Sequence, residues 1–268
     1  MPKIELNGVE ISFEERGSGE PLLFLHGWNS SRNQWMHNLK AMTPGFRALA
    51  PDLPGFGDSG ESEAYPYTLD GLAHFVEDFR KALHLPSLNL VGHSMGGCIA
   101  LRYTGLYGER VGKLVLVSTP TTRYSLGLRN LIPGAKAFLS ITYRFRSEKM
   151  LMWMFYRSLY KPEYQDLDFV RANVKAASHI PRHVLTATAG MVREVKLEDD
   201  LRGVDLPTLI VFGDRDRSVS TTEVGRQREL LSRPYVAVIS SCAHCPPFER
   251  PELFNHLVKD FLQEETLG

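Results

Sequence analysis

The stretch that decides the fold of this 268-residue chain is Leu88-Asn-Leu-Val-Gly-His-Ser-Met-Gly96. Its first part, Leu88 to Gly92, is a short continuous apolar run, which is typical of a strand buried on both faces of a parallel sheet. The pattern that follows, from Cys98 to Tyr107, is helical. Ser94 therefore lies at a predicted strand-to-helix turn, where flanking glycines let two backbones approach and leave the serine hydroxyl exposed.

Similar patterns surround this stretch along the chain. Two short alternating segments between Lys3 and Glu14, joined at Asn7-Gly8, predict an antiparallel hairpin at one edge of the sheet. The clearest helix is Tyr67 to Leu83, with apolar residues at helical spacing and Thr68 as its N-cap. Because strands alternate with helices, we expect an α/β fold with a mostly parallel central sheet and helices on both faces. The other strands predicted before residue 120 are Pro21–His26, Phe46–Ala50 and Leu114–Ser118.

The alternation of strands and helices stops near Pro120. From Thr121 to about Leu201 the pattern is helical, rich in Arg, Met and aromatic residues, and interrupted by prolines at 133, 162 and 181. We therefore expect a core formed by residues 1–120 and 202–268, with residues 121–201 inserted after the sixth strand as a helical cap. The alternation resumes with a strand at Pro207–Gly213, a helix at Glu223–Leu231, a strand at Tyr235–Ile239 and a final helix at Pro251–Leu262.

The composition excludes several classes of protein. Lys and Arg total 31, as do Asp and Glu, so the net charge of zero gives no basic field for a nucleic acid or an anionic membrane. Three cysteines are too few for a disulfide framework. No apolar run approaches the ~18 residues of a membrane span. We expect a cytoplasmic protein, a monomer or homodimer, with no nucleic-acid partner and no membrane span.

Two aspartates and a histidine come shortly after later predicted strands, just as Ser94 comes shortly after an earlier one. A serine hydroxyl becomes a nucleophile only when a base takes its proton, and that base needs an orienting acid. Asp214 and Asp216 follow the strand that ends at Gly213, and His244 follows the next strand. Open α/β sheets place their sites at the carboxyl ends of strands. The pattern therefore predicts one site with Ser94 as nucleophile, His244 as base and one of the two aspartates as acid.

In these motifs and in two more, the chain resembles the α/β-hydrolase superfamily. Leu25-His-Gly-Trp28 follows a predicted strand at the place where that family forms half of its oxyanion hole. Asp52-Leu-Pro-Gly-Phe-Gly-Asp-Ser59 is similar to the family's loop after the following strand. The resemblance covers nearly the whole chain except the cap, and it implies the α/β-hydrolase fold.

The resemblance also implies roles for individual residues. The family's order of nucleophile, acid and histidine corresponds to Ser94, Asp216 and His244, because its usual acid lies three residues after the glycine. The backbone N–H groups of Trp28 and Met95 would form the oxyanion hole. We therefore expect a serine esterase, a carboxylic ester hydrolase for a small-molecule substrate with a small to medium apolar acyl group, which uses a catalytic triad and needs no metal and no cofactor.

Other activities of the superfamily stay open. Serine at position 94 argues for acyl chemistry, because haloalkane dehalogenases and most epoxide hydrolases of this fold have aspartate there. Carbon–carbon bond hydrolases resemble this chain in order and cap, but many have tryptophan after the histidine, where this chain has Cys245. Cofactor-free haloperoxidases share the triad. Hormone receptors and stress-signalling proteins of the fold keep it while acting mainly by ligand binding.

Structural roles explain several other polar residues. Cys242-Ala-His-Cys245 offers three metal ligands, whereas a closed zinc site needs four, so we expect no metal. Turn chemistry in a glycine-rich loop accounts for Asp52 and Asp58. His26 is expected to shape the oxyanion loop.

The apolar run Met150-Leu-Met-Trp-Met-Phe-Tyr156 belongs to the inserted segment. An insertion that leaves the sheet at a strand's carboxyl end and returns before the next strand must lie over the face that carries Ser94. Adaptable Met and aromatic side chains suit an apolar group in a pocket closed to water, although the same side chains could instead pack the cap's own helices. We expect the substrate to contact His93, Trp153, Met154 and Tyr156.

Overall fold

The computed structural model describes residues 1–123, 125, 147–160 and 166–264. The first two strand pairings at one edge of the sheet are antiparallel, and the remaining pairings are parallel. The predicted mostly parallel sheet is therefore confirmed. Within the described ranges the sheet has eight strands in the order β1 (Lys3–Leu6), β2 (Val9–Arg16), β4 (Phe46–Pro51), β3 (Glu20–Leu25), β5 (Leu88–His93), β6 (Val111–Val117), β7 (Thr208–Gly213) and β8 (Pro234–Ile239).

The alternating segments of the sequence form strands at the edge of the sheet, and the continuous apolar runs form strands in its middle. At the edge, Asn7 and Gly8 join β1 to β2 with φ of 51° and 77°, the left-handed backbone that a tight hairpin turn needs. In the middle, every residue of β5 and of β7 is buried. Burial on both faces explains why these central strands are continuous apolar runs rather than alternating ones.

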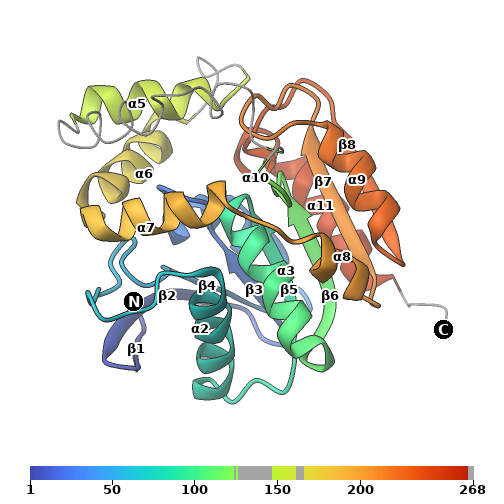
Figure 1. Cartoon of the computed structure of the whole chain (residues 1–268), viewed down its shortest axis with the longest axis horizontal. Helices are drawn as coiled ribbons and strands as arrows, with labels where there is room; N and C mark the ends of the chain where they lie inside the picture. Colours follow the sequence, from blue (N-terminus) through green and yellow to red (C-terminus); the bar gives the residue numbers. More distant parts are fainter. Residues whose placement is uncertain (124, 126–146, 161–165, 265–268) are drawn as a thin grey trace.

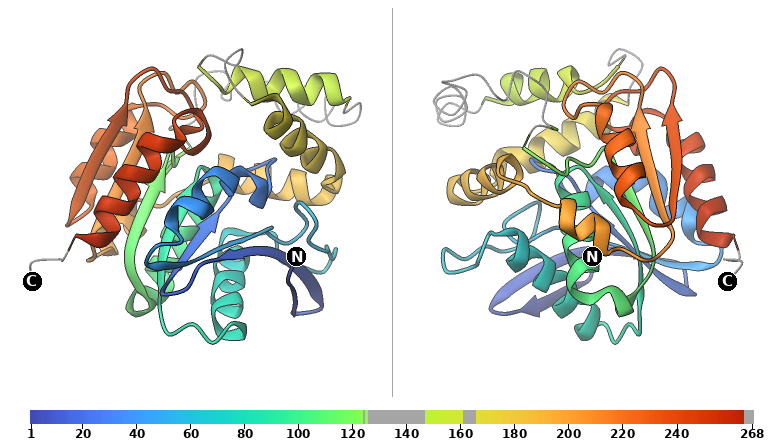
Figure 2. Two further views of the ribbon diagram at one scale, coloured as in Figure 1. Left: turned by 180° about the vertical axis from the view of Figure 1, so that it is seen from behind. Right: turned by 45° about the vertical axis from the view of Figure 1, so that its right-hand side comes forward.

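Helices cover both faces of the sheet (Figures 1 and 2). On one face α2 (Leu69–Ala82) packs against α3 (Met95–Tyr107) over a core that includes Leu23 and Leu25 of β3. On the other face α1 (Met36–Met42) and α11 (Pro251–Gln263) pack together over a second core, which includes Leu22 and Phe24. Alternate side chains of one strand thus enter opposite layers. The remaining elements of this part are η1 (Arg32–Trp35), η2 (Gly108–Arg110), α8 (Glu198–Gly203), α9 (Thr222–Leu230) and α10 (Pro246–Glu249).

Among the described residues between β6 and β7, three more helices precede α8, namely α5 (Glu148–Arg157), α6 (Leu167–His179) and α7 (Arg182–Arg193). Figure 1 shows α5 and α6 at the top, apart from the helices that flank the sheet. A third apolar core joins α5 and α6 to Phe248 of α10. The division of the chain at 120–121 and 201–202 stays a prediction, and α8, which packs on α3, spans its second boundary. Residues 133 and 162, two of the predicted helix breaks, lie outside the described residues.

The turn from β5 to α3 brings three segments of backbone into contact. Ser94 has φ 53° and ψ −114°, a conformation that residues other than glycine rarely adopt. A Cβ atom on Gly92 would collide with the Gly96 carbonyl oxygen, and one on Gly96 would collide with the Leu25 carbonyl oxygen at the end of β3. The two glycines therefore let the turn lie directly against the sheet and fix the position of Ser94.

Candidate active site

Ser94 lies at the carboxyl edge of the sheet, immediately before the first turn of α3. Its backbone N–H donates to the carbonyl oxygen of Val117 at the end of β6 (2.8 Å), and its carbonyl oxygen accepts from the Cys98 N–H (3.1 Å). The turn is thus bound to the neighbouring strand and to the helix that follows. Because the N-terminal end of a helix carries a partial positive charge, an anion formed beside Ser94 would be stabilised there.

His244 and Asp216 lie side by side, although 27 residues separate them. The Nδ1 atom of His244, in the loop after β8, is 2.9 Å from Oδ2 of Asp216, in the loop after β7. The other carboxylate oxygen of Asp216 accepts the backbone N–H groups of Ser218 (2.8 Å) and Val219 (3.0 Å), which fixes its orientation. Since Nδ1 donates to the carboxylate, Nε2 of neutral His244 has no proton and can act as a base.

The structure distinguishes the two candidate aspartates. The Asp216 carboxylate is fully buried beside His244. Asp214 is partly exposed, accepts the Cys242 N–H at 3.3 Å and pairs with Arg215 at 3.5 Å. Asp214 therefore supports the loop, and Asp216 orients the histidine.

Burial and charge act in opposite directions on this pair. Burial disfavours the imidazolium form of His244, but attraction by Asp216 outweighs it, so the pKa of His244 is raised. Burial also disfavours the Asp216 carboxylate, but His244 and the two backbone donors hold the pKa of Asp216 below its usual value. Asp216 can therefore stay ionised and stabilise a positive charge that forms on His244.

Two other buried histidines connect the loops around Ser94. Burial lowers the pKa of His93 to about 3 and that of His26 to about 4, so both are neutral. His93 donates from Nε2 to the carbonyl oxygen of His244 at 2.7 Å. His26 accepts the Leu53 N–H at Nε2 (3.0 Å) and donates from Nδ1 to the Gly27 carbonyl oxygen (2.9 Å). The geometry agrees with the expectation that His26 shapes the loop after β3.

The predicted oxyanion hole involves that same loop. The Gly27 N–H donates to Oε1 of Gln34 at 3.2 Å, and the Trp28 indole donates to Thr188 of α7 at 3.1 Å. The Trp28 amide, the next one along the chain, is the donor that the family resemblance predicts in this loop. Met95 is the first residue of α3 and is buried. The roles of the two amides stay a prediction.

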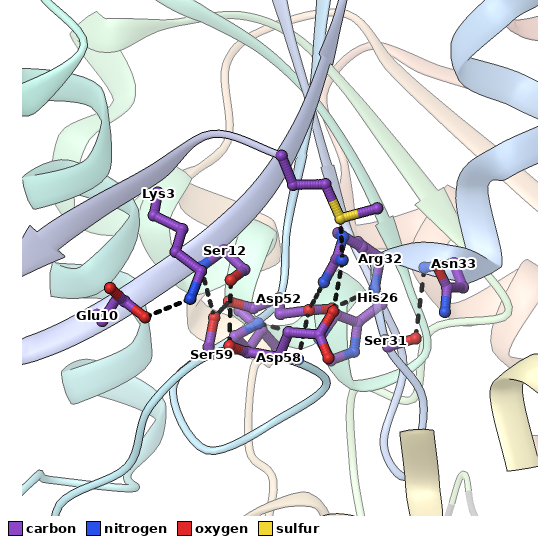
Figure 3. Close-up of polar contacts among 12 residues, drawn as sticks. Lys3, Glu10, Ser12, His26, Ser31, Arg32, Asn33, Asp52, Asp58 and Ser59 are labelled. Carbon is purple, nitrogen blue, oxygen red and sulfur yellow. Dashed lines mark hydrogen bonds and ion pairs between the residues drawn. The ribbon is translucent and has the colours of Figure 1, made fainter. Parts of the chain in front are cut away.

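Asp52 and Asp58 anchor a loop through the polar contacts drawn in Figure 3. Neither of them lines the cavity described below. The Asp52 carboxylate accepts the backbone N–H groups of Arg32 (2.7 Å) and Asp58 (2.8 Å), and it also pairs with the Arg32 guanidinium. Arg32 in turn pairs with Asp58 at 2.6 Å. A Cβ atom on Gly57 would collide with the Asp52 carboxylate. Both aspartates thus have structural contacts. Besides the turn, they bind the buried Arg32.

A cavity of about 340 Å³ adjoins Ser94 and His244. The lining comes from the loops at the carboxyl edge of the sheet and from α5, α6, α7 and α10. Most of the wall is apolar, with Leu151, Met154, Phe155, Phe169, Val174, Ala177, Ala189, Val192, Val219 and Phe248.

Two of the four residues that were expected to contact the substrate line this cavity. His93 and Met154 line the cavity, whereas Trp153 and Tyr156 do not. These two lie around a separate surface hollow on another side of α5, where the Arg157 guanidinium is 4.7 Å from the Trp153 ring. The side chains of α5 that face the cavity are spaced three or four residues apart, and Trp153 and Tyr156 are out of phase with them.

Sequence reasoning also missed aromatic residues of the wall. Phe169 of α6 stacks on Phe248 of α10, with ring centroids 4.1 Å apart. Phe248 is four residues after His244, in the same turn, and this proximity to a predicted catalytic residue was the available signal. Phe169 has no such signal, because its place depends on how α6 packs.

Neither a metal site nor a membrane-spanning helix is found within the described part of the chain. No group of three His, Cys, Asp or Glu side chains there has an arrangement that could hold a metal ion. Burial raises the pKa of the Cys242 and Cys245 thiols, which disfavours the thiolate form that binds metals. No helix among these residues is long and apolar enough to cross a bilayer.

Comparisons with known proteins agree with the fold. A family model described as the alpha/beta hydrolase fold matches residues 20–251. The chain is 27% identical to a 2-hydroxy-6-oxo-6-(2'-aminophenyl)hexa-2,4-dienoic acid hydrolase of Metapseudomonas resinovorans, covering 98% of this chain and 91% of that protein. It is 26% identical to a pimeloyl-[acyl-carrier protein] methyl ester esterase of Aeromonas salmonicida, covering 95% and 100%. An esterase of Exiguobacterium antarcticum superposes with a TM-score of 0.86, at 22% identity, over 97% of both chains.

Removing the charge of Asp216 should lower the pKa of His244. The pKa is raised only because attraction by Asp216 outweighs burial, so in Asp216→Asn the effect of burial dominates and the imidazolium is disfavoured. NMR titration of the His244 ring measures this change. Asp214→Asn is the matched control and should leave the titration unchanged. An unchanged titration in Asp216→Asn, or a larger change in Asp214→Asn, would contradict the pairing.

Proposed function

The chain belongs to the alpha/beta hydrolase family, and from that premise we propose that it is a serine hydrolase that uses Ser94, His244 and Asp216 as its catalytic triad. The observation that carries the proposal is the bond between His244 Nδ1 and Asp216 Oδ2 beside a cavity that Ser94 lines. The curated relatives named above include an esterase and a second hydrolase. Both support hydrolysis as the reaction class.

The proposed reaction follows from the protonation states of the pair. Ser94 Oγ attacks the carbonyl carbon of an ester while Nε2 of His244 takes its proton. Asp216 stabilises the imidazolium, which then gives the proton to the leaving alcohol. An acyl-enzyme remains on Ser94, and water releases the acid with His244 again as base. No step requires a metal or an organic cofactor.

In this proposal the tetrahedral intermediate is stabilised by the backbone N–H groups of Trp28 and Met95. The partial positive charge at the start of α3 supports a role for Met95. The resemblance to the family, which forms half of its oxyanion hole in this loop, supports Trp28 as the donor from the loop after β3. Two backbone donors, held by the Ser94 turn and by His26, would be rigid before the substrate binds.

We propose carboxylic esters with a small to medium apolar acyl group as the substrate class. The apolar side chains that α5, α6 and α7 contribute to the cavity wall support this choice, and so does the similarity to a methyl ester esterase. In this proposal the three helices act as the cap that covers the site.

A second candidate is hydrolysis of a carbon–carbon bond in an oxo-dienoic acid. The similarity to a hydrolase of that substrate class supports it. The polar or charged wall residues Asn29, Gln34, Asn173 and Arg193 would suit oxygen-rich groups better than an alkyl chain. The two candidates share the triad and differ in the bond that is cleaved.

A substrate panel tests the proposed function. The wild-type protein and Ser94→Ala would be assayed on esters, thioesters, lactones, amides and an oxo-dienoic acid, with kcat/KM as the measure. We expect ester hydrolysis to be fastest, and Ser94→Ala or His244→Ala to lose on the order of 10⁵- to 10⁶-fold in kcat, because nucleophile and base act as one unit. Faster turnover of the oxo-dienoic acid would select the second candidate. Turnover of no substrate, or turnover that survives Ser94→Ala, would contradict the proposal.

The length of the acyl chain tests the apolar wall. A buried methylene contributes ~0.8 kcal/mol, so kcat/KM should rise about three- to fourfold per added carbon until the cavity is full, with butyrate to octanoate esters preferred over acetate. Met154→Ala should move the optimum to longer chains, because Met154 lines the cavity. The matched control is Trp153→Ala on the same helix, which should keep the wild-type optimum. A flat series, or equal effects of the two variants, would contradict the assignment.

A further inference from the structure

One buried carboxylate, that of Glu249, accepts hydrogen bonds from the loop that carries His244. Oε1 of Glu249, in α10, accepts the backbone N–H of Cys245 at 2.9 Å and that of Ala243 at 3.1 Å. These two amides stand immediately before and after His244. Glu249 is 8% exposed, so water has little access to compete for them. One side chain therefore fixes both backbone neighbours of His244.

The same carboxylate also binds the segment that follows α5. Oε2 of Glu249 accepts the Tyr160 N–H at 2.7 Å. The His244 N–H donates to the Ser158 carbonyl oxygen at 3.0 Å. Two hydrogen bonds thus join the His244 loop to the residues directly after Arg157, the last residue of α5.

This connection links the base to the wall of the cavity. The helix that ends at Arg157 contributes Leu151, Met154 and Phe155 to the wall. A movement of α5 would therefore be transmitted to the His244 loop through the two bonds. Such a movement would change the place of His244 relative to Ser94.

The carboxylate also has an electrostatic effect. The partners of the Glu249 carboxylate are backbone N–H donors, so it accepts best when ionised. Burial raises the pKa of Glu249, and the hydrogen bonds from these N–H groups oppose that change. Burial lowers the pKa of His244, and the charges of Asp216 and then of Glu249 raise it. The other titratable groups around this loop include His93, Cys242 and Cys245, which are buried. Asp214 accepts the Cys242 N–H, and the Arg250 guanidinium donates to the Ser241 carbonyl oxygen.

We propose that Glu249 is a positioning residue that holds His244 and the end of α5 as one unit, so that the catalytic base stays in register with the substrate cavity. The inference rests on the proposed function for its catalytic meaning. It assigns no contact between Glu249 and the substrate. If Glu249 served only to stabilise α10, its loss would lower the stability of the protein without changing the titration of His244.

Glu249→Gln tests this role, with Glu223→Gln as the matched control. Glu223 is a second buried carboxylate that accepts a backbone amide, that of Thr121 at 3.2 Å, but it lies on α9 away from the His244 loop. In Glu249→Gln one oxygen acceptor must serve three amides, and the charge is lost. We expect kcat/KM on the best ester to fall about 10- to 100-fold, mainly in kcat, because the base is misplaced. We also expect NMR titration to give a lower pKa for His244.

Glu223→Gln should lower the unfolding temperature and leave the His244 titration unchanged. Glu249→Asp keeps the charge on a shorter side chain, so it should lose kcat while His244 titrates closer to wild type. It also carries the test if Glu249→Gln does not fold. A wild-type titration and kcat in folded Glu249→Gln, wild-type kcat in Glu249→Asp, or the same shift in Glu223→Gln would overturn the proposal.

The titration does not depend on turnover, so it separates the two proposals. If the wild-type protein hydrolyses no ester but His244 titrates lower in Glu249→Gln, the proposed function fails and the positioning contact stands. If esters are hydrolysed and the titration is unchanged, the positioning role fails and the proposed function stands.

Discussion

The contact between three backbone segments at the Ser94 turn is the constraint on which the rest of the site depends. No side chain separates the end of β3 from the start of α3, because Gly92 and Gly96 leave no Cβ atom in the gap. The loops that leave β3 and β5 are therefore fixed relative to each other before any substrate binds. The positive φ of Ser94 follows from this packing, and the surrounding structure must hold that unusual conformation in place.

Three histidines around this turn behave differently because only one of them has a carboxylate partner. Burial lowers the pKa of His26 and of His93, so both stay neutral and serve as hydrogen-bonding links between loops. The His244 side chain is largely buried, with 12% of it exposed, but the charge of Asp216 raises its pKa. The contact with Asp216 therefore explains why His244 can accept and hold a proton, whereas His26 and His93 remain neutral.

The sequence predicts the strands from their apolar runs, and it predicts the Ser94 turn and His244 from local patterns at the ends of strands. These patterns leave Asp214 and Asp216 open as the acid, and the choice of Asp216 comes from the resemblance to the family. It does not predict which side of α5 faces the cavity, because helical spacing gives a relative phase but no absolute direction. Trp153 was therefore expected at the substrate, whereas it lies outside the cavity beside Ser94. Glu249 was missed for a related reason: its three partners come from two loops that meet only in the fold. The sequence around Glu249, two prolines before it and a helix start after it, does not indicate these contacts.

The central claim is that Ser94 is activated by His244, which Asp216 orients. The most direct measurement is mass analysis of the intact and of the digested protein after treatment with a fluorophosphonate, which bonds to an activated serine oxygen and releases fluoride. The account predicts one adduct on the peptide that contains Ser94, no adduct in Ser94→Ala, and much slower labelling in Asp216→Asn than in Asp214→Asn. An adduct on another residue, or labelling of Ser94→Ala at the wild-type rate, would contradict the account.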